Sequence, residues 1–342
     1  MRSTRALVFA SLSFAALALA QLGASGEEAV PIRHGWVVLN STMSPLLFQK
    51  RDILKHYGQS YTVDAIHFAG TSPEIIALAT GQIEVATLAY SSFANAIENG
   101  AVPDMRIIAD GFQDGAKDYD SIRYMVKNDS PIRKVEDLKG KILGINVIGA
   151  AVDIGGRAVL KKHGLEFPRD YSIIEAPFPA IGAMLLEGKA DIVSMVTPFL
   201  YAPAVQAGAR TLFTMKDGMG TSQMIVLVSR ESILQAHRAA FDDFFEDMVR
   251  GTHWMLDPQN REAALTLAAT ASKLPPALLE PFYLTKKDSY RNPNGIPDLV
   301  AFQRNIDAQV QFGFLKHSFN VKKYADLSFI ERAAKKVETA QR

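Results

Sequence analysis

Short apolar runs alternate with amphipathic helical segments along the first two thirds of the chain. Ile32–Leu39 and Thr62–Phe68 have the pattern of buried strands, and a helix is expected between them over Pro45–His56. Thr71–Glu74 combines hydroxyl residues, a proline and a carboxylate, which is a typical helix start, and the strand Ile83–Leu88 follows that helix. This alternation predicts an α/β fold with parallel, doubly wound sheets.

The same order of elements recurs further along the chain, where residues 182–193 line up with residues 75–86. The turn residues that α/β units have in common would produce the same similarity as a duplication of the segment, and the two explanations stay open. Either way the chain holds two similar units. We expect lobe I to comprise residues 27–117 plus 221–342 and lobe II residues 118–220. The polar, glycine-containing stretches 111–120 and 216–220 are the expected crossings, and the chain from Glu231 onward is expected to form C-terminal helices.

The N-terminus has the features of a secretory signal peptide. Arg2 and Arg5 precede the apolar stretch Ala6–Ala20, which is shorter than the roughly 20 residues that span a bilayer. Small residues suit cleavage after Ala20 or Gly26, so residues 1–26 are the expected signal peptide; a buried N-terminal helix is the alternative. No later apolar run is long enough for a membrane anchor, and lipidation would need a cysteine, which the chain lacks. We therefore expect a periplasmic protein without an anchor.

Composition removes several classes of function. Without Arg2 and Arg5 the chain holds 35 basic residues (37 − 2) against 36 acidic ones, a formal charge of −1, which does not favour nucleic acid as a partner. The lack of cysteine excludes thiolate metal sites and cysteine nucleophiles. The seven histidines form no ligand-spaced cluster, and Gly149 with Gly155-Gly156 does not make a dinucleotide loop, so neither a metal nor a cofactor is expected. His67, in an apolar strand, is expected to be a buried core histidine.

Candidate chemistry lies at the helix starts that should line the space between two such lobes. Helix N-termini expose unpaired N–H groups and partial positive charge, so they hold oxyanions without basic side chains. Ordinary helix capping is the alternative for each hydroxyl. Arg123 is a possible counter-ion or a structural ion pair, and Asp153 either meets a ligand donor or only favours its helix start. The candidate ligand contacts are Ser41, Ser44, Thr71, Tyr90, Ser91, Arg123, Ala150, Ala151, Val152 and Thr197.

Four stretches give the chain a family resemblance: Thr71–Ala86, the segment from Val135-Glu136-Asp137-Leu138-Lys139-Gly140-Lys141 to Leu165, Leu185–Gly208, and Tyr324–Ile330. Together they resemble the periplasmic binding proteins of the nitrate/sulfonate/taurine group of ABC transporters, over nearly all of the chain after residue 26. The resemblance implies a type II periplasmic binding protein fold with two lobes that close by a hinge. It also implies a monomer that carries a small molecule to a transporter permease and catalyses nothing.

One departure from that family bears on the ligand. Members that bind small oxyanions often have Ser, Thr or His where this chain has Ala150, Ala151 and Val152. We therefore expect a less polar pocket and an organic anion, a sulfonate or a carboxylate, with a hydrophobic or aromatic body. A periplasmic ligand sensor and a binder of a neutral pyrimidine-like metabolite are the alternatives. The thiamin-pyrimidine synthase enzymes share the implied fold, but their cysteine-rich segment cannot exist in this chain.

Overall fold

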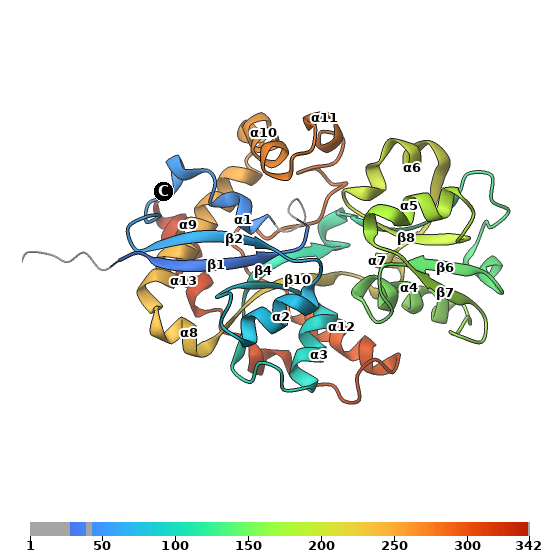
Figure 1. Ribbon diagram of the computed structural model, residues 1–342, viewed down its shortest axis with the longest axis horizontal. Helices are drawn as coiled ribbons and strands as arrows, with labels where there is room; N and C mark the ends of the chain where they lie inside the picture. Colours follow the sequence, from blue (N-terminus) through green and yellow to red (C-terminus); the bar gives the residue numbers. More distant parts are fainter. Residues whose placement is uncertain (1–27, 39–42, 341–342) are drawn as a thin grey trace, which may run out of the picture.

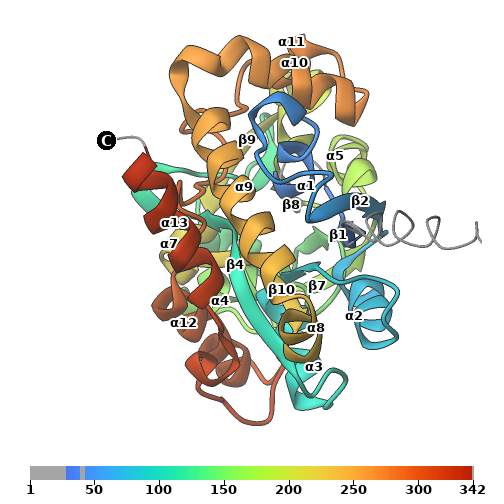
Figure 2. The ribbon, with the colours of Figure 1, turned by 90° about the vertical axis from the view of Figure 1, so that its left-hand side faces the viewer.

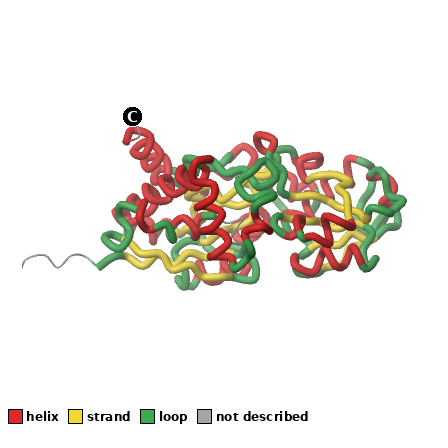
Figure 3. The backbone as a smooth tube through the Cα atoms, turned by 90° about the horizontal axis from the view of Figure 1, so that it is seen from above, coloured by secondary structure: helices red, strands yellow, loops and turns green. Residues whose placement is uncertain are grey.

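The computed structural model describes residues 28–38 and 43–340, and its strands gather in two separate groups (Figures 1 and 3). We call the larger part, which contains both termini of the described chain, lobe I, and the part with the five-stranded sheet lobe II. The expected two-lobed α/β fold is confirmed. The predicted signal peptide and its two cleavage sites lie outside the described residues.

Lobe I is built on two small sheets. The strands β1 and β2 pair in parallel, and a bridge between His34 and Val85 ties β1 to the approach to β3. In the other sheet β10 lies between β3 and β4 and is antiparallel to both. The strands are β1 (Val30–Trp36), β2 (Tyr61–His67), β3 (Ala86–Ala89), β4 (Met105–Asp114) and β10 (Ser222–Arg230). The helices between these strands are α1 (Ser44–Leu47), α2 (Thr71–Ala79) and α3 (Tyr90–Glu98).

Lobe II has one mixed sheet in the order β7-β6-β8-β5-β9. Only β6 pairs in parallel with its neighbours, whereas β5 is antiparallel to β8 and β9, so the sheet is not purely parallel as the pattern suggested. The strands are β5 (Ile122–Lys127), β6 (Ile142–Ile145), β7 (Ser172–Glu175), β8 (Ile192–Val196) and β9 (Ala209–Thr214). The helices are α4 (Ala151–Lys162), α5 (Phe178–Leu186), α6 (Pro203–Gly208) and α7 (Met215–Met219).

The expected C-terminal helices cover lobe I. Figure 2 shows α9 crossing one face of this lobe with α13 beside it, and α9 supplies buried Phe241, Phe244 and Phe245 to the core there. These helices are α8 (Glu231–Ala236), α9 (Arg238–Leu256), α10 (Arg261–Ser272), α11 (Pro276–Leu279), α12 (Leu299–Gln311) and α13 (Ser328–Ala340).

The expected crossings are more ordered than loops. Gly111 lies inside β4, and a Cβ there would come within 2.6 Å of Ile225 Cγ2, so this glycine permits close strand packing rather than a bend. Most of the stretch 216–220 forms α7, whose start is closed by a capping box between Thr214 and Asp217. One cluster of buried apolar residues extends through both lobes, from Tyr90 and Phe93 to Tyr124 and Ile154. The lobes are therefore packed against each other.

Two local predictions in lobe I are wrong. The helix expected over Pro45–His56 ends at Leu47: Gln49 N and Lys50 N donate to carbonyls only three residues back, and the N–H groups of Lys55 and His56 donate to the carboxylate of Asp247 on α9. His67 is exposed rather than buried, and its ring packs on Trp36 with centroids 4.5 Å apart. Both outcomes depend on tertiary contacts that a local pattern does not record.

Candidate functional site

Two of the predicted helix starts face each other across the lobes. Helix α3 begins at Tyr90 in lobe I and α4 begins at Ala151 in lobe II. The Tyr90 hydroxyl donates to the carbonyl oxygen of Ala151 at 2.7 Å, and both residues are buried. Burial raises the pKa of Tyr90 well above its usual value, so the phenol keeps the proton that this bond needs. The helix starts around Tyr90 and Ala151 are the centre of the candidate site.

The start of α4 is shaped from within lobe II. The hydroxyl of Tyr124 donates to the carbonyl oxygen of Val152, and Ala150 stands at the N-cap without a side chain that could cap the helix. Asp153 is fully buried, and its two carboxylate oxygens accept from Gly149 N at 2.9 Å and Arg157 Nε at 2.8 Å. Asp153 therefore supports the loop before α4 through both of its carboxylate oxygens.

The hydroxyls of lobe I do not cap their helices. Thr71 is the first residue of α2, whose N-cap is Gly70, and its Oγ1 lies 2.5 Å from Ser92 Oγ. Ser91, in the first turn of α3, is buried. No side chain caps α2, α3 or α4, so the first-turn N–H groups of these helices have no side-chain acceptor in the described structure. Uncapped helix starts suit an oxyanion.

Ser44 belongs to a buried hydrogen-bond network that the sequence did not reveal. Its hydroxyl lies 2.9 Å from His34 Nε2, while His34 Nδ1 lies 3.0 Å from the carbonyl oxygen of Gly35. A carbonyl only accepts, so Nδ1 carries the proton and the Ser44 hydroxyl donates to Nε2. Burial lowers the pKa of His34 to about 4. Nothing in the local sequence marks His34 as buried, since it stands between Arg33 and Gly35.

Glu74 extends this hydrogen-bond network behind the site. Its carboxyl accepts from Thr87 N at 2.6 Å, and Thr87 Oγ1 lies 3.2 Å from the carbonyl of Gly35. Burial raises the pKa of Glu74 to about 8, so the side chain is neutral at pH 7. The sequence showed Glu74 only as a first-turn carboxylate; its inward direction follows from the packing of α2 on β3.

The remaining described candidates, Thr197 and Arg123, have partners within lobe II or the crossing before it. Thr197 does not begin an α-helix, because a short 3-10 turn follows it and α6 begins only at Pro203. The N–H and the hydroxyl of Thr197 both donate to the carbonyl oxygen of Ser121. Arg123 Nε is paired with Asp120 Oδ2 at 2.9 Å. Ser41 lies outside the described residues.

Apolar and aromatic side chains at the ends of the strands were not singled out from the sequence. Val147 and Ile148, after β6, are 54 % and 46 % exposed, which is unusual for residues of this kind. They precede the α4 start that faces Tyr90 of lobe I. Phe178, the first residue of α5, stacks with Phe199 at a centroid distance of 6.3 Å. A hydrophobic run directly after a strand is the signal that could have revealed Val147 and Ile148.

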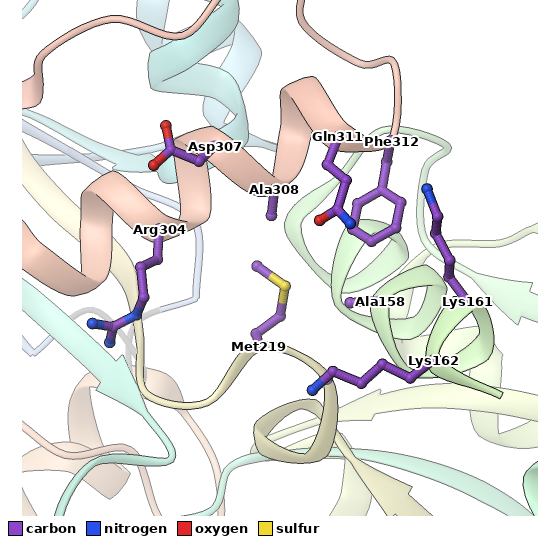
Figure 4. A pocket seen from close by; sticks show the side chains of 10 residues that line it. Ala158, Lys161, Lys162, Met219, Arg304, Asp307, Ala308, Gln311 and Phe312 are labelled. Atoms are coloured by element: carbon purple, nitrogen blue, oxygen red, sulfur yellow. The ribbon is translucent and has the colours of Figure 1, made fainter.

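A separate open groove lies between the lobes at the other end of α4. Figure 4 shows α12 on one side of it, α4 on the other and Met219 of α7 at its floor. The groove is lined by Ala158, Lys161, Lys162, Gly218, Met219, Arg304, Asp307, Ala308, Gln311 and Phe312. None of these is a predicted ligand contact. Lys161 and Lys162 stand in the last turn of α4, where cations neutralise the helix dipole.

One cluster in the described residues has the chemistry of metal ligands. His56, Asp243 and Glu246 bring their ligand atoms within 4.8 Å of one another. Glu246, however, is already paired with Arg250 at 2.8 Å and Lys336 at 3.5 Å. These two cations oppose a bound metal ion, so we assign no metal to the cluster. Within the described residues, no helix combines the length and apolar character needed to cross a membrane.

Comparison with known proteins places this geometry in a family context. Residues 118–261 match the protein family described as NMT1/THI5 like. The alkanesulfonate-binding protein SsuA of Xanthomonas axonopodis pv. citri, bound to MOPS, is similar at a TM-score of 0.70 with 19 % identity, over 88 % of this chain and 99 % of that one. The nitrate-binding protein NrtA of Synechocystis PCC 6803 gives a TM-score of 0.71 with 14 % identity, over 91 % and 90 %.

An enzyme shares the fold as well. The desulfurization enzyme DSZB is similar at a TM-score of 0.63 with 14 % identity, over 90 % of this chain and 99 % of that one. No protein of curated function matches the sequence. The family resemblance found in the sequence is thus confirmed by the matched domain and the fold. This chain contains an NMT1/THI5-like domain and has the two-lobed fold of the periplasmic sulfonate- and nitrate-binding proteins.

Proposed function

We propose that this chain is the periplasmic solute-binding component of an ABC importer, and that it captures a small organic anion by closing its two lobes. The observation that carries the proposal is the meeting of the α3 and α4 starts, joined by the bond from Tyr90 to Ala151. Uncapped N–H groups from both lobes would then surround one acidic group. A ligand that contacts both lobes only when they are shut favours the shut form.

The ligand that suits this arrangement has an acid group and an apolar body. Ala150, Ala151 and Val152 bring no hydroxyl to the α4 start, and the neighbouring Val147 and Ile148 are exposed. An aliphatic or aromatic body would cover those two side chains and gain the free energy of removing them from water. Sulfonates and carboxylates with such a body are therefore the proposed substrates.

Catalysis is the rival that the likeness to DSZB raises. The Ser44–His34 contact has the composition of a nucleophile and its base. The lowered pKa of His34 makes it a poor proton acceptor at neutral pH, and Ser44 is only 8 % exposed. Capture without bond breaking therefore accounts better for this pair, which binds α1 to β1.

The proposal includes a periplasmic monomer, exported by residues 1–26, that docks on a permease. A sensor with the same lobes, or a binder of a neutral pyrimidine-like metabolite, would use the same closure. A neutral ligand would not need the uncapped helix starts, which is why an anion is preferred. A pull-down with the permease, against one with a receptor, would separate transport from sensing.

The test is a thermal-shift screen of residues 27–342 against alkanesulfonates, aromatic carboxylates, nitrate, bicarbonate and pyrimidines. A ligand at about 100 times its Kd adds about 2.7 kcal/mol to the free energy of unfolding. We expect shifts with organic acids that exceed those with inorganic oxyanions. Displacement of every organic acid by nitrate or bicarbonate would contradict the proposed ligand class, and no shift with any solute would contradict capture itself.

A further inference from the structure

A second contact between the lobes lies beside the candidate site, outside the bond from Tyr90 to Ala151. It is made by Phe314, in the loop after α12. Lobe I holds this loop, since Phe314 N donates to Gln309 O at 2.8 Å and Lys316 N donates to Glu98 Oε1 at 2.7 Å. The Phe314 ring nevertheless packs on lobe II, where a Cβ on Gly149 would lie 3.6 Å from it.

The same ring covers Arg157 of α4. The Arg157 guanidinium carbon lies 4.9 Å from the centroid of Phe314 and 4.3 Å from that of Phe167, so aromatic rings of both lobes contact it. The side chain is 12 % exposed, and its Nη2 is buried without a hydrogen-bond partner among the described residues. Burial of an unpaired guanidinium N–H costs free energy. In the closed form, contact with the two ring faces offsets part of that cost.

Arg157 in turn determines the geometry of the lobe II half of the site. Its Nε donates to Asp153, and the other oxygen of Asp153 accepts from Gly149 N. Gly149 has a φ of +80°, a conformation that favours glycine, and the residues after it form the N-cap and first turn of α4. An unbroken series of contacts therefore connects Phe314 of lobe I, through Arg157 and Asp153, to the loop that begins α4.

We propose that Phe314 is a positioning residue for the ligand site: by covering Arg157 when the lobes close, it fixes the Gly149–Ala151 loop in the form that receives the ligand. This inference rests on the proposed capture mechanism and extends it. The lobe II half of the site is completed by contact with lobe I, so closure and assembly of the site occur together. Separation of the lobes removes one of the two rings from Arg157 and loosens the loop.

The experiment compares F314A with F319A. Phe319 is a matched control, because it is also a half-buried phenylalanine of the same segment, but its ring contacts are to Phe93 and Tyr324 within lobe I. Hydrogen–deuterium exchange over residues 147–154 is measured on the ligand-free proteins, because the described lobes are already packed against each other. F314A should exchange faster there than wild type, and F319A should not, since only the first loses support for the bond from Gly149 to Asp153.

Ligand affinity provides the second measurement. Loss of one cation–π contact should weaken binding by about 2- to 30-fold in F314A relative to F319A. F314L keeps bulk without the ring and should resemble F314A, whereas F314Y should restore wild-type behaviour. F314L also replaces F314A should the alanine variant fail to fold. Unchanged exchange at 147–154 in the F314A or F314L protein would overturn the inference, and because that readout needs no ligand, it is independent of the proposed function.

Discussion

At the scale of single residues, the Tyr90 hydroxyl reports directly on the contact between the lobes. Replacing Tyr90 by Phe removes its bond to Ala151 and leaves the ring in place. A net hydrogen bond contributes about 0.5–1.5 kcal/mol, so Y90F should weaken ligand affinity by about 2- to 12-fold and favour the open form. Isothermal titration calorimetry and solution scattering measure the two effects.

Tyr124 supplies the control for this change. Its hydroxyl also donates to a backbone carbonyl of α4, that of Val152, but the bond lies within lobe II. Y124F should lower the melting temperature without altering the overall dimensions of the ligand-free protein. Equal scattering curves for Y90F and wild type would show that the Tyr90 bond does not hold the lobes together.

Glu74 gives a prediction for pH dependence. Its folded pKa of about 8 exceeds its ordinary value of 4.5, so between these pH values the folded chain holds a proton that the unfolded chain has lost. Stability attributable to Glu74 therefore decreases as pH rises through this window, by at most about 1.4 kcal/mol per pH unit. E74Q stays neutral, so its melting temperature relative to wild type should increase steadily from pH 5 to pH 8.

The exposed glutamate Glu262 on α10 is the comparison for that series. E262Q removes one exposed carboxyl and should change the melting temperature by the same small amount at every pH, because surface substitutions away from buried contacts alter stability little. A constant difference between E74Q and wild type across the series would mean that Glu74 is ionised in the fold.

At the scale of elements, the positions of helix starts and strands could be predicted from the sequence, but the tertiary contacts of their side chains could not. The starts of α2, α3 and α4 were marked by local patterns such as Thr71–Glu74, because the residue preferences of a first helical turn act over a few positions, although no side chain there caps its helix. The segment after α1 is held by Asp247, nearly two hundred positions away, and the ring of His67 packs on Trp36 of the neighbouring strand. The sequence therefore marked Tyr90 and Ala151 as candidates but gave no sign of His34 or Phe314.

The α4 start offers a test of ligand charge. Ala150 is its N-cap and lies beside the buried Ala151. A150E places a carboxylate at the uncapped N–H groups and should weaken binding of an organic anion by more than about tenfold, because the side chain competes with the ligand and repels it. A150Q is the matched control of equal size and should retain most of the affinity. Equal losses in both variants would indicate a neutral ligand.

At the scale of the whole molecule, the chain has a formal net charge of only +1, and the proposed site relies on backbone N–H groups. Affinity for the ligand should therefore change by less than about threefold between about 0.05 and about 0.5 M NaCl, since buried dipoles are screened far less than surface cations. Titration calorimetry over this range measures it. A steep loss of affinity with salt would indicate that exposed lysines or arginines attract the ligand.

The strand order of lobe I has a consequence for how the chain is assembled. The central strand β10 separates β3 from β4 yet comes last of the three in sequence, after the whole of lobe II. During synthesis β3 and β4 are complete before β10, which ends at residue 230, has been made. Until then each of the two strands has an unpaired edge with which another chain could pair. Lobe II needs no later segment to complete its own sheet. A chain that stops before β10 would thus expose two unpaired strands and be prone to aggregate.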